Sequence, residues 1–387
     1  MGVLTARRAK PALPFAGVHR LIDFTLSSFM HSEFDDVWVA VQYQARSLDA
    51  YLAGGRPWSL DRNRGGFRLI APQTETGPGD TQGFATGNAD LLLRLADDIA
   101  GSGAGLLVVS SADHVCSADL ARVVDEHDES GAALTMLTST VTKTEARRKA
   151  VVSVADGGAV TGVAYKPARP ESGLVAAEIF VYSVRPLLDA LREIRHEEGG
   201  EEGLGDFGHH LLPRLIDGGR VRAVELGGYW RDVGLPEAYL EAHRDVLAGR
   251  ADDVFCAGRP VVSHWPDLPA SRLRGGCLVE DSIVSPGCDV AGEVVRSVLG
   301  PGTVVAAGAR VEDSVLLDGV VVEARARVES SIVDEGCVVG ERGCVGALAG
   351  GRRVREGDLA VLGMGVRVGP GAEVAPGTRC PPDARVR

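Results

Sequence analysis

The sequence predicts a two-part chain, an α/β domain followed by a parallel β-helix. Two observations carry this prediction. Short apolar runs alternate with helical patterns over roughly the first 245 residues, and after about Val254 the helical periodicity gives way to a repeat. We expect the α/β domain over residues 1–247, a linker over 248–270 and the β-helix over 271–387.

The α/β domain is predicted from short apolar runs and amphipathic segments. Residues 37–41 and 106–110 are continuous apolar runs, which are typical of strands buried on both faces of a parallel sheet. Helical patterns lie between such runs, for example over 89–99 and 186–197. Residues 198–205 are charged and rich in glycine, so we expect an exposed loop there.

The β-helix is predicted from a repeat with a constant period. Ser282, Ser297, Ser314 and Ser331 recur about 18 residues apart, which is the length of one triangular coil of three hexapeptides. Small apolar residues alternate with Gly or Pro-Gly corners between them, as stacked coils require. A β-sandwich would not keep so constant a period. We interpret the four serines as structural, and residues 349–358 as a loop that interrupts the repeat.

Composition limits the classes of partner. The 387 residues carry a net charge of −12, which argues against a nucleic-acid or anionic membrane surface, because both need a basic footprint. A small anionic substrate needs only local cations. No apolar run approaches the length of a membrane span, and the first ten residues lack the apolar core of a signal peptide. The seven scattered cysteines include no C-x-x-C pair, so we expect reduced thiols in a cytoplasmic protein.

A cluster of cations near the N-terminus predicts a phosphate site. Arg7, Arg8 and Lys10 precede a proline-stiffened loop. Fixed charges on a rigid loop are a common way of holding a nucleoside triphosphate, because little side-chain entropy is left to lose. Lys10 and Arg7 are the candidate catalytic cations, whereas the alternative for Arg8 is a solvated surface position.

Two acids are candidate metal ligands. Asp113 follows the apolar run 106–111, and ligands gather at the carboxyl ends of strands in open α/β sheets. The alternative for Asp113 is a helix cap. Asp232 lies in Trp-Arg-Asp at 230–232, which could equally be a surface turn. Two carboxylates plus substrate phosphates would suffice for Mg²⁺.

Candidate substrate-binding residues lie in three further segments. Lys166 precedes a proline and, taken alone, is typical of a solvated loop. Gly87 and Asp90 belong to a glycine-containing turn over 83–90, where a backbone could approach a ligand or a helix could simply begin. Gln73 could read a base through its amide. The Asp-Phe-Gly at 206–208 is not a kinase motif, since no catalytic loop accompanies it, and the adjacent histidines 209 and 210 diverge on a helix.

Taken in order, these segments resemble the glucose-1-phosphate adenylyltransferases (ADP-glucose pyrophosphorylases) among the sugar-phosphate nucleotidyltransferases. Residues 112–114 resemble the family's Gly-Asp-His and residues 230–234 its Trp-x-Asp-x-Gly. Residues 165–167 resemble its Glu-Lys-Pro, and residues 206–213 match its Asp-Phe-Gly-x-x-Leu-Leu-Pro. The turn at 83–90 resembles its Gly-Thr-Ala-Asp. The resemblance extends from residue 5 to about residue 339, nearly the whole chain.

The resemblance implies a fold and a reaction. It implies a Rossmann-like nucleotidyltransferase domain followed by a left-handed parallel β-helix, and the conversion of ATP and α-D-glucose 1-phosphate to ADP-glucose and pyrophosphate. Asp113 and Asp232 would bind Mg²⁺. Lys10 and Arg7 would contact the triphosphate and Lys166 the sugar phosphate, with Gly87, Asp90 and Gln73 near the base and sugar. A homotetramer is also implied.

The chain departs from the family pattern at three places. Tyr165 stands where the family has a glutamate that binds a sugar hydroxyl, and residues 176–182 lack the family's sugar-contacting serine. Glucose stays the expected sugar. The family places a glycine-rich phosphate loop just before Arg7, and this sequence begins at Met1. We therefore expect an in-frame glycine-rich segment upstream of Met1.

Three alternatives stay open. A sister enzyme would use another nucleoside triphosphate or another sugar phosphate. An acyltransferase site in the β-helix would need a catalytic histidine, and His264 in the linker is the only histidine available there. A catalytically silent regulatory subunit would bind sugar phosphate and assemble with an active partner, and the absent glycine-rich loop is its best support.

Overall fold

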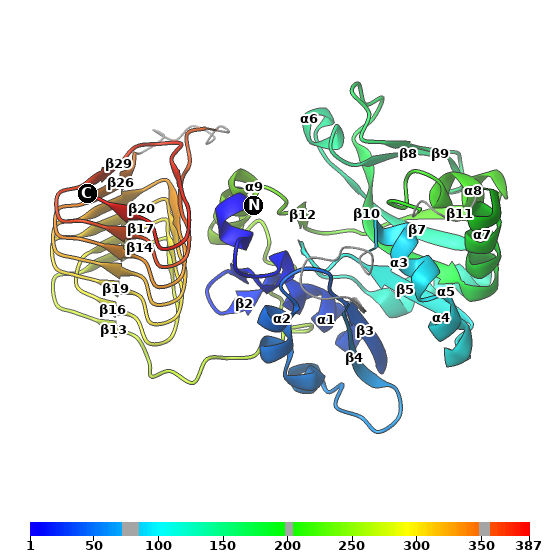
Figure 1. Cartoon of the computed structure of the whole chain (residues 1–387), viewed down its shortest axis with the longest axis horizontal. Coiled ribbons are helices and arrows are strands. Elements are labelled where there is room, and N and C mark those ends of the chain that lie inside the picture. The colour runs from blue at the N-terminus through cyan, green and yellow to red at the C-terminus, as the bar shows by residue number, and fades with distance from the viewer. Residues whose placement is uncertain (72–84, 198–203, 348–356) are drawn as a thin grey trace, which may run out of the picture.

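A computed structural model of the chain describes residues 1–71, 85–197, 204–347 and 357–387. The β-helix forms one lobe and the α/β domain the other, with the N-terminal segment lying between them (Figure 1). The predicted fold class is confirmed. None of the helices in the described ranges combines the length and the hydrophobicity needed to cross a membrane.

The α/β lobe is built on a mixed sheet with the strand order β11-β7-β10-β8-β9, and β5 also pairs with β10. Strands β11 and β7 are parallel, whereas β10 is antiparallel to β5, β7 and β8. A separate parallel pair is formed by β3 and β4. The bounds are β3 Asp36–Ala40, β4 Gly66–Ile70, β5 Leu106–Ser110, β7 Leu134–Thr140, β8 Ala150–Val154, β9 Val160–Tyr165, β10 Leu174–Ser183 and β11 Val221–Glu225.

The predicted surroundings of β5 are wrong in two respects. The run 106–110 does form a strand, but it pairs antiparallel with β10, and all five of its residues are only half-buried. A continuous apolar run predicts a strand, and it reports neither the direction of the neighbouring strand nor how completely the two faces are covered. Within the described ranges, β3 pairs only with β4 and β5 only with β10. The expectation about a segment upstream of Met1 stays a prediction.

Helices cover the sheet and line the boundary with the β-helix. The expected helix over 89–99 is two short helices, α3 and α4, separated at Leu95, where φ −90° and ψ 1° leave the helical region. The helix expected over 186–197 is confirmed within α7. The bounds are α1 Leu21–His31, α2 Ala45–Leu52, α3 Asn88–Arg94, α4 Ala96–Ser102, α5 Leu120–Ser130, α6 Lys143–Ala146, α7 Val184–Glu197, α8 Leu211–Asp217 and α9 Pro236–Leu247, with 3₁₀ turns η1 Gly2–Thr5, η2 Lys10–Ala12 and η3 Ala53–Trp58.

The β-helix has three parallel faces, as stacked coils require. The first face contains β13 Arg272–Leu273, β16 Asp289–Val290, β19 Val304–Val305, β22 Val321–Val322, β25 Val338–Val339, β28 Arg367–Val368 and β31 Arg385–Val386. The second contains β14 Leu278–Glu280, β17 Glu293–Val295, β20 Arg310–Glu312, β23 Arg327–Glu329, β26 Cys344–Gly346 and β29 Glu373–Val374. The third contains β15 Ile283–Val284, β18 Val298–Leu299, β21 Val315–Leu316, β24 Ser331–Val333, β27 Ala360–Leu362 and β30 Arg379–Cys380. The loop expected at 349–358 falls largely outside the described residues.

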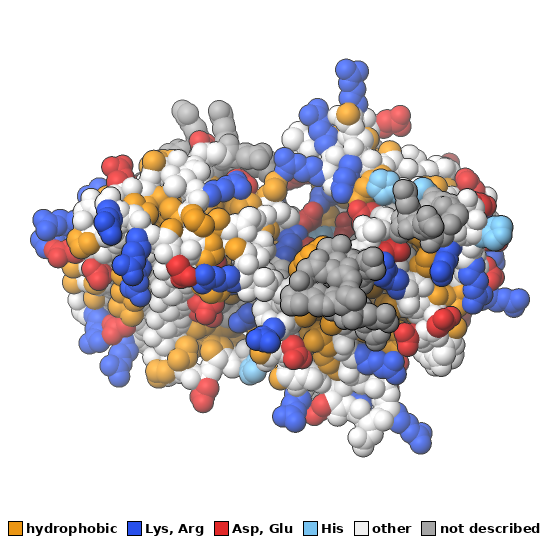
Figure 2. Space-filling model, in the orientation of Figure 1, with side chains coloured by type: hydrophobic (Ala, Val, Ile, Leu, Met, Phe, Trp, Pro, Cys, Tyr) orange, Lys and Arg blue, Asp and Glu red, His pale blue; other side chains and the backbone are white. Residues whose placement is uncertain are grey.

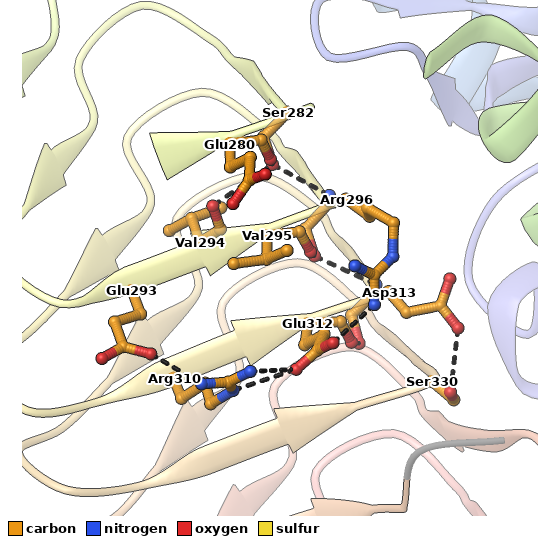
Figure 3. Close-up of polar contacts among 12 residues, drawn as sticks. Glu280, Ser282, Glu293, Val294, Val295, Arg296, Arg310, Glu312, Asp313 and Ser330 are labelled. Atoms are coloured by element: carbon orange, nitrogen blue, oxygen red, sulfur yellow. Dashed lines mark hydrogen bonds and ion pairs between the residues drawn. The ribbon is translucent and has the colours of Figure 1, made fainter. Parts of the chain in front are cut away.

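The four repeated serines form a column through successive coils. The Oγ atoms of Ser282, Ser297 and Ser314 each accept a hydrogen bond from the backbone N–H of the next serine, at 3.0, 3.1 and 3.1 Å. Each coil therefore supplies the acceptor that a buried N–H of the following coil needs. Figure 3 shows Ser282, the first serine of this column, beside a partly buried bridge in which Arg310 joins Glu293 and Glu312. The structural interpretation of the serines is confirmed.

One of the buried hydrophobic clusters contains residues of both lobes. Phe15 and Tyr239 of the α/β lobe pack in the same buried cluster as Val298, Val315 and Ile332 of the β-helix. The interface also contains ion pairs, one of which joins Arg244 on α9 to Asp313, with Nε at 2.8 Å from Oδ1. The β-helix is therefore packed against the lobe that carries the candidate site.

Candidate active site

The site is assembled by a short pair of strands. Strand β12 (Trp230–Asp232) pairs antiparallel with β6 (His114–Cys116), with Asp232 opposite His114. This pairing brings Asp232 next to Asp113, which immediately precedes β6. Two acids that are distant in sequence thereby reach the same place, which the short Trp-Arg-Asp segment does not itself reveal.

Lys10 lies between the two acids. Its Nζ is 2.6 Å from Asp113 Oδ2 and 3.6 Å from Asp232 Oδ1. The lysine begins the 3₁₀ turn η2, whose second residue is Pro11, so the loop backbone is stiff at this point. The structure therefore brings together Lys10, Asp113 and Asp232, three residues that the sequence analysis selected from separate segments.

His114 and Lys149 complete the inner part of the site. His114 Nε2 lies 3.6 Å from Asp113 Oδ1 and 3.9 Å from Asp232 Oδ1, and its Nδ1 is 3.2 Å from the carbonyl oxygen of Ala177. Lys149 Nζ is 2.8 Å from Asp232 Oδ2. Neither residue was singled out from the sequence. Adjacency to Asp113 was the available signal for His114, and no motif marks Lys149.

The charges of the site stabilise one another. Burial disfavours ionised Asp113, but the neighbouring His114 and Lys10 outweigh burial and hold the pKa of Asp113 below its ordinary value. Burial also disfavours ionised Asp232, but His114 and Lys149 outweigh burial and hold the pKa of Asp232 well below its ordinary value. Burial also disfavours charged Lys10, yet the two carboxylates raise its pKa. Both acids are consequently ionised and Lys10 is protonated at neutral pH.

The donor set suits a hard divalent cation bound together with phosphate. Two carboxylates supply oxygen ligands, and such ions commonly use one or two carboxylates plus substrate phosphates and water. Within the described ranges no group of three or more His, Cys, Asp or Glu side chains could hold a metal by itself. The remaining coordination positions would therefore have to come from substrate oxygens and water.

Lys166 lies at the end of β9 and is linked to Lys149 through the backbone. Its N–H donates to the carbonyl oxygen of Lys149 at 2.9 Å. Its ammonium lies 4.5 Å from the ring centroid of Tyr165, and the Tyr165 hydroxyl donates to Asp206 Oδ2 at 2.6 Å. Lys166 has φ +47°, a left-handed conformation that is uncommon outside glycine and is concentrated at functional sites.

Glu178 is a second left-handed residue near the acids. It has φ +56° and lies in β10 where the pairing with β7 shifts register. Its Oε2 is 3.9 Å from His114 Nε2, and its carbonyl oxygen accepts from the N–H of Ser111 at 2.9 Å. At this irregularity of β10 a third carboxylate therefore lies near His114. Residues 176–182 were compared with the family's sugar-contacting segment, but Glu178 itself was not predicted to lie near the acids, because its position depends on the irregular pairing of β10.

The two N-terminal arginines do not lie at the acidic pair. Arg7 forms an exposed ion pair with Asp383 of the β-helix at 2.5 Å, so its role at a triphosphate stays a prediction. The solvated position considered for Arg8 is wrong. Arg8 is 4% exposed and pairs with Asp334 at 2.6 Å, because the packing of the β-helix against the N-terminal segment encloses it.

Of the three remaining predicted residues, Gly87 and Asp90 have structural neighbours of their own. Gly87 precedes α3, and a Cβ there would lie 2.2 Å from the carbonyl carbon of Gly205, so the close backbone approach requires glycine. Asp90 Oδ2 accepts from the N–H of Thr86 at 2.9 Å and from Arg94 Nε at 3.0 Å. Gln73 lies outside the described residues. Substrate contacts by these three residues stay predictions.

The site lies near the junction of the two lobes. Basic and acidic side chains are interspersed over the visible face of the molecule (Figure 2). The overall net charge of −12 is therefore not concentrated in one acidic face on this side.

Two family models match separate parts of the chain. A family model described as "Nucleotidyl transferase" matches residues 3–249, and one described as "GlmU-like, C-terminal hexapeptide" matches residues 271–355. A glucose-1-phosphate adenylyltransferase of Acetivibrio thermocellus is 31% identical over 315 residues, covering 81% of this chain and 72% of that protein. Proteins of the same name from Streptomyces avermitilis and Streptomyces coelicolor are each 33% identical over 331 residues, covering 80% of this chain and 79% and 81% of theirs.

Proposed function

Because this chain belongs to the nucleotidyl transferase family, we propose that it transfers the adenylyl group of ATP to α-D-glucose 1-phosphate, giving ADP-glucose and pyrophosphate. Relatives of 31–33% identity that carry the name glucose-1-phosphate adenylyltransferase support this choice of substrates. The observation that carries the proposal is the position of Lys10 between Asp113 and Asp232.

The reaction is an in-line displacement at the α-phosphorus of ATP. A phosphate oxygen of the sugar 1-phosphate forms the new P–O bond as the bond between the α-phosphorus and the bridging oxygen breaks, and pyrophosphate leaves with that electron pair. No covalent enzyme intermediate is needed. Catalysis then consists of holding the two anions in line and neutralising charge on the α-phosphate and on the leaving group.

The chain's own side chains divide this work. Lys10 turns from the acids toward the triphosphate and compensates charge there, with Arg7 as a second cation. Lys166 holds the phosphate of the sugar phosphate. His114 stays behind the acidic pair, with its Nδ1 near a backbone carbonyl, and holds the two carboxylates in place.

We assign the metal to Asp113 and Asp232 and propose that it is Mg²⁺. Proteins of this family generally use a divalent metal, and the oxygen donors of the two carboxylates suit a hard ion. When bound, Mg²⁺ supplies charge neutralisation and fixes the phosphate geometry. The carboxylates are ionised and need no proton loss before they can coordinate it.

The remaining substrate contacts are proposed by family resemblance. Gly87 and Asp90, at the start of α3, would lie near the nucleotide, and Gln73 would read the adenine. Tyr165 replaces the expected sugar-binding glutamate, and its hydroxyl is bound to Asp206. A different sugar phosphate is therefore the main alternative substrate, and a catalytically silent regulatory subunit is the alternative role.

The compartment and the oligomeric state are also proposed by family resemblance. We propose a cytoplasmic enzyme that assembles as a homotetramer. All seven cysteines are free thiols, which a reducing compartment maintains. An acyltransferase site is not favoured, because the β-helix itself contains no histidine and His264 lies in the linker.

A substrate panel tests the proposal. The full chain is incubated with each of ATP, UTP, GTP and dTTP, combined in turn with glucose, mannose, galactose and N-acetylglucosamine 1-phosphates, and pyrophosphate release is followed. ATP with glucose 1-phosphate should give the highest kcat/KM, and the product should co-elute with ADP-glucose. A higher kcat/KM with another pair would replace the substrates. No turnover with any pair, together with binding of sugar phosphate, would favour the regulatory subunit.

A further inference from the structure

Lys149 is a second cation on the acidic pair, and the reaction as proposed does not use it. It lies between α6 and β8, and its Nζ is 2.8 Å from Asp232 Oδ2. Lys10 approaches the other oxygen of Asp232, Oδ1, at 3.6 Å. Both oxygens of this carboxylate therefore face an ammonium group.

The position of Lys149 is fixed from several sides. Its side chain is 13% exposed, and its Nζ lies 4.7 Å from the centroid of the Trp230 ring, within range of a cation–π interaction. Its own N–H donates to the carbonyl oxygen of Ala146 at 3.1 Å, and its carbonyl oxygen accepts from Lys166. A surface lysine on a flexible stem would have none of these restraints, so Lys149 acts as a built-in charge of the site.

Each carboxylate of the pair already has an ammonium group beside it before any metal enters. Asp113 and Asp232 carry two negative charges, and Lys10 and Lys149 carry two positive charges. Lys10 belongs to the candidate triphosphate loop and can turn toward nucleotide phosphates. Lys149 is enclosed against Trp230 and Asp232, so its charge stays next to any cation at the pair and repels it.

We infer that Lys149 is a permanent counter-ion of Asp232 that weakens divalent-metal binding by the free protein, so that metal binds tightly only together with the nucleotide. This inference rests on the proposed role of Asp113 and Asp232 as metal ligands. A triphosphate supplies the negative charge that offsets Lys149, and it draws Lys10 away from the pair. Lys149 is thus a positioning residue that orders the binding of metal and nucleotide.

Metal titration tests the inference without any measurement of turnover. Mn²⁺ is titrated into the nucleotide-free full chain, and free Mn²⁺ is followed by electron paramagnetic resonance. Lys149→Met keeps the apolar stem over Trp230 and removes the charge, so the dissociation constant for Mn²⁺ should fall about ten-fold or more. Lys149→Arg keeps the charge and should stay near the wild-type value. Lys143→Met changes an exposed lysine on the neighbouring helix α6 and is the matched control.

The outcomes separate this inference from the proposed function. An unchanged dissociation constant in Lys149→Met, or an equal change in Lys143→Met, would overturn the inference even if the protein makes ADP-glucose. The predicted tightening would support it even if the substrate panel selects other substrates. Lys149→Gln is a second neutral variant, and failure of both neutral variants to fold would replace the inference with a purely structural role.

Discussion

The β-helix and the active-site lobe are stabilised in different ways. In the β-helix the same contact is made in coil after coil. Val294, Val311, Val328 and Val345 stand in register on successive strands and are at most 1% exposed. In the active-site lobe the decisive contacts are made once, such as the pairing of β12 with β6 that joins Asp232 to Asp113. The stability of the β-helix is therefore distributed over many equivalent contacts, whereas the geometry of the site depends on contacts that are each made once.

The largest stability effect is expected where the lobes meet. Arg8 and Asp334 are almost fully buried, with side-chain exposures of 4% and 1%. Arg8→Met leaves a buried carboxylate without its cation, so the free energy of unfolding should fall by about 3–5 kcal/mol. Chemical denaturation followed by circular dichroism measures this loss.

Arg7 provides the matched control for Arg8. Its ion pair with Asp383 is exposed, so Arg7→Met should change the free energy of unfolding by only about 0–1 kcal/mol. Equal losses in the two variants would mean that burial does not distinguish these neighbouring arginines.

A smaller loss is expected inside one coil of the β-helix. Leu316 is fully buried in the β-helix core. Leu316→Ala removes three side-chain carbon atoms and leaves a cavity, so the free energy of unfolding should fall by about 2–5 kcal/mol. Leu278 in the first coil is 47% exposed, so Leu278→Ala should have an effect of about 0.5 kcal/mol or less. A lower melting temperature for the Leu278 variant than for the Leu316 variant would contradict the assignment of the core.

Asp318, a largely buried acid close to Arg8, predicts that the stability of the protein depends on pH. Burial, reinforced by Glu335, raises the pKa of Asp318 to about 6, and Arg8 and Arg20 only partly oppose this. The folded state therefore holds this proton more strongly than the unfolded state, and stability should fall as the pH rises from about 4 to about 6. Asp318→Asn removes this contribution and should raise stability at pH 7 by about 1–3 kcal/mol.

The pH prediction is checked by thermal unfolding of both proteins between pH 4 and pH 7. Asp23, whose pKa burial also raises to about 6, is present in both proteins, so only the difference between them reports on Asp318. An identical pH dependence in the two proteins would show that Asp318 does not titrate in this range.

The smallest effect is expected in the serine column. Ser314 Oγ accepts from the N–H of Ser331 at 3.1 Å and donates to the carbonyl oxygen of Glu312 at 2.8 Å. Ser314→Ala leaves a buried N–H unpaired, which should cost about 1–2 kcal/mol. Ser282, in the more exposed first coil, should lose less on the same substitution, because water can replace its hydroxyl. Hydrogen exchange of the Ser331 amide would report the local change.

The same comparison explains what the sequence could predict. The β-helix was predicted from spacing, because each coil repeats a local pattern and contacts only its neighbours. Lys10, Asp113 and Asp232 were found through short motifs, whereas their proximity depends on strand pairing between distant segments. Lys149 has no motif and acquires its role only from the corner between α6 and β8. The partner of Arg8 follows from the packing of two lobes, which no local pattern encodes.

The central claim is that Asp113 and Asp232 with Lys10 form a site for chemistry and are not needed for folding. The most direct test is the rate of ADP-glucose formation from ATP and glucose 1-phosphate by the wild type and by Asp113→Asn, with thermal unfolding measured on the same samples. We predict a loss of turnover of roughly 1,000-fold or more with a melting temperature close to that of the wild type. Near-normal turnover in the folded Asp113→Asn variant would contradict the account.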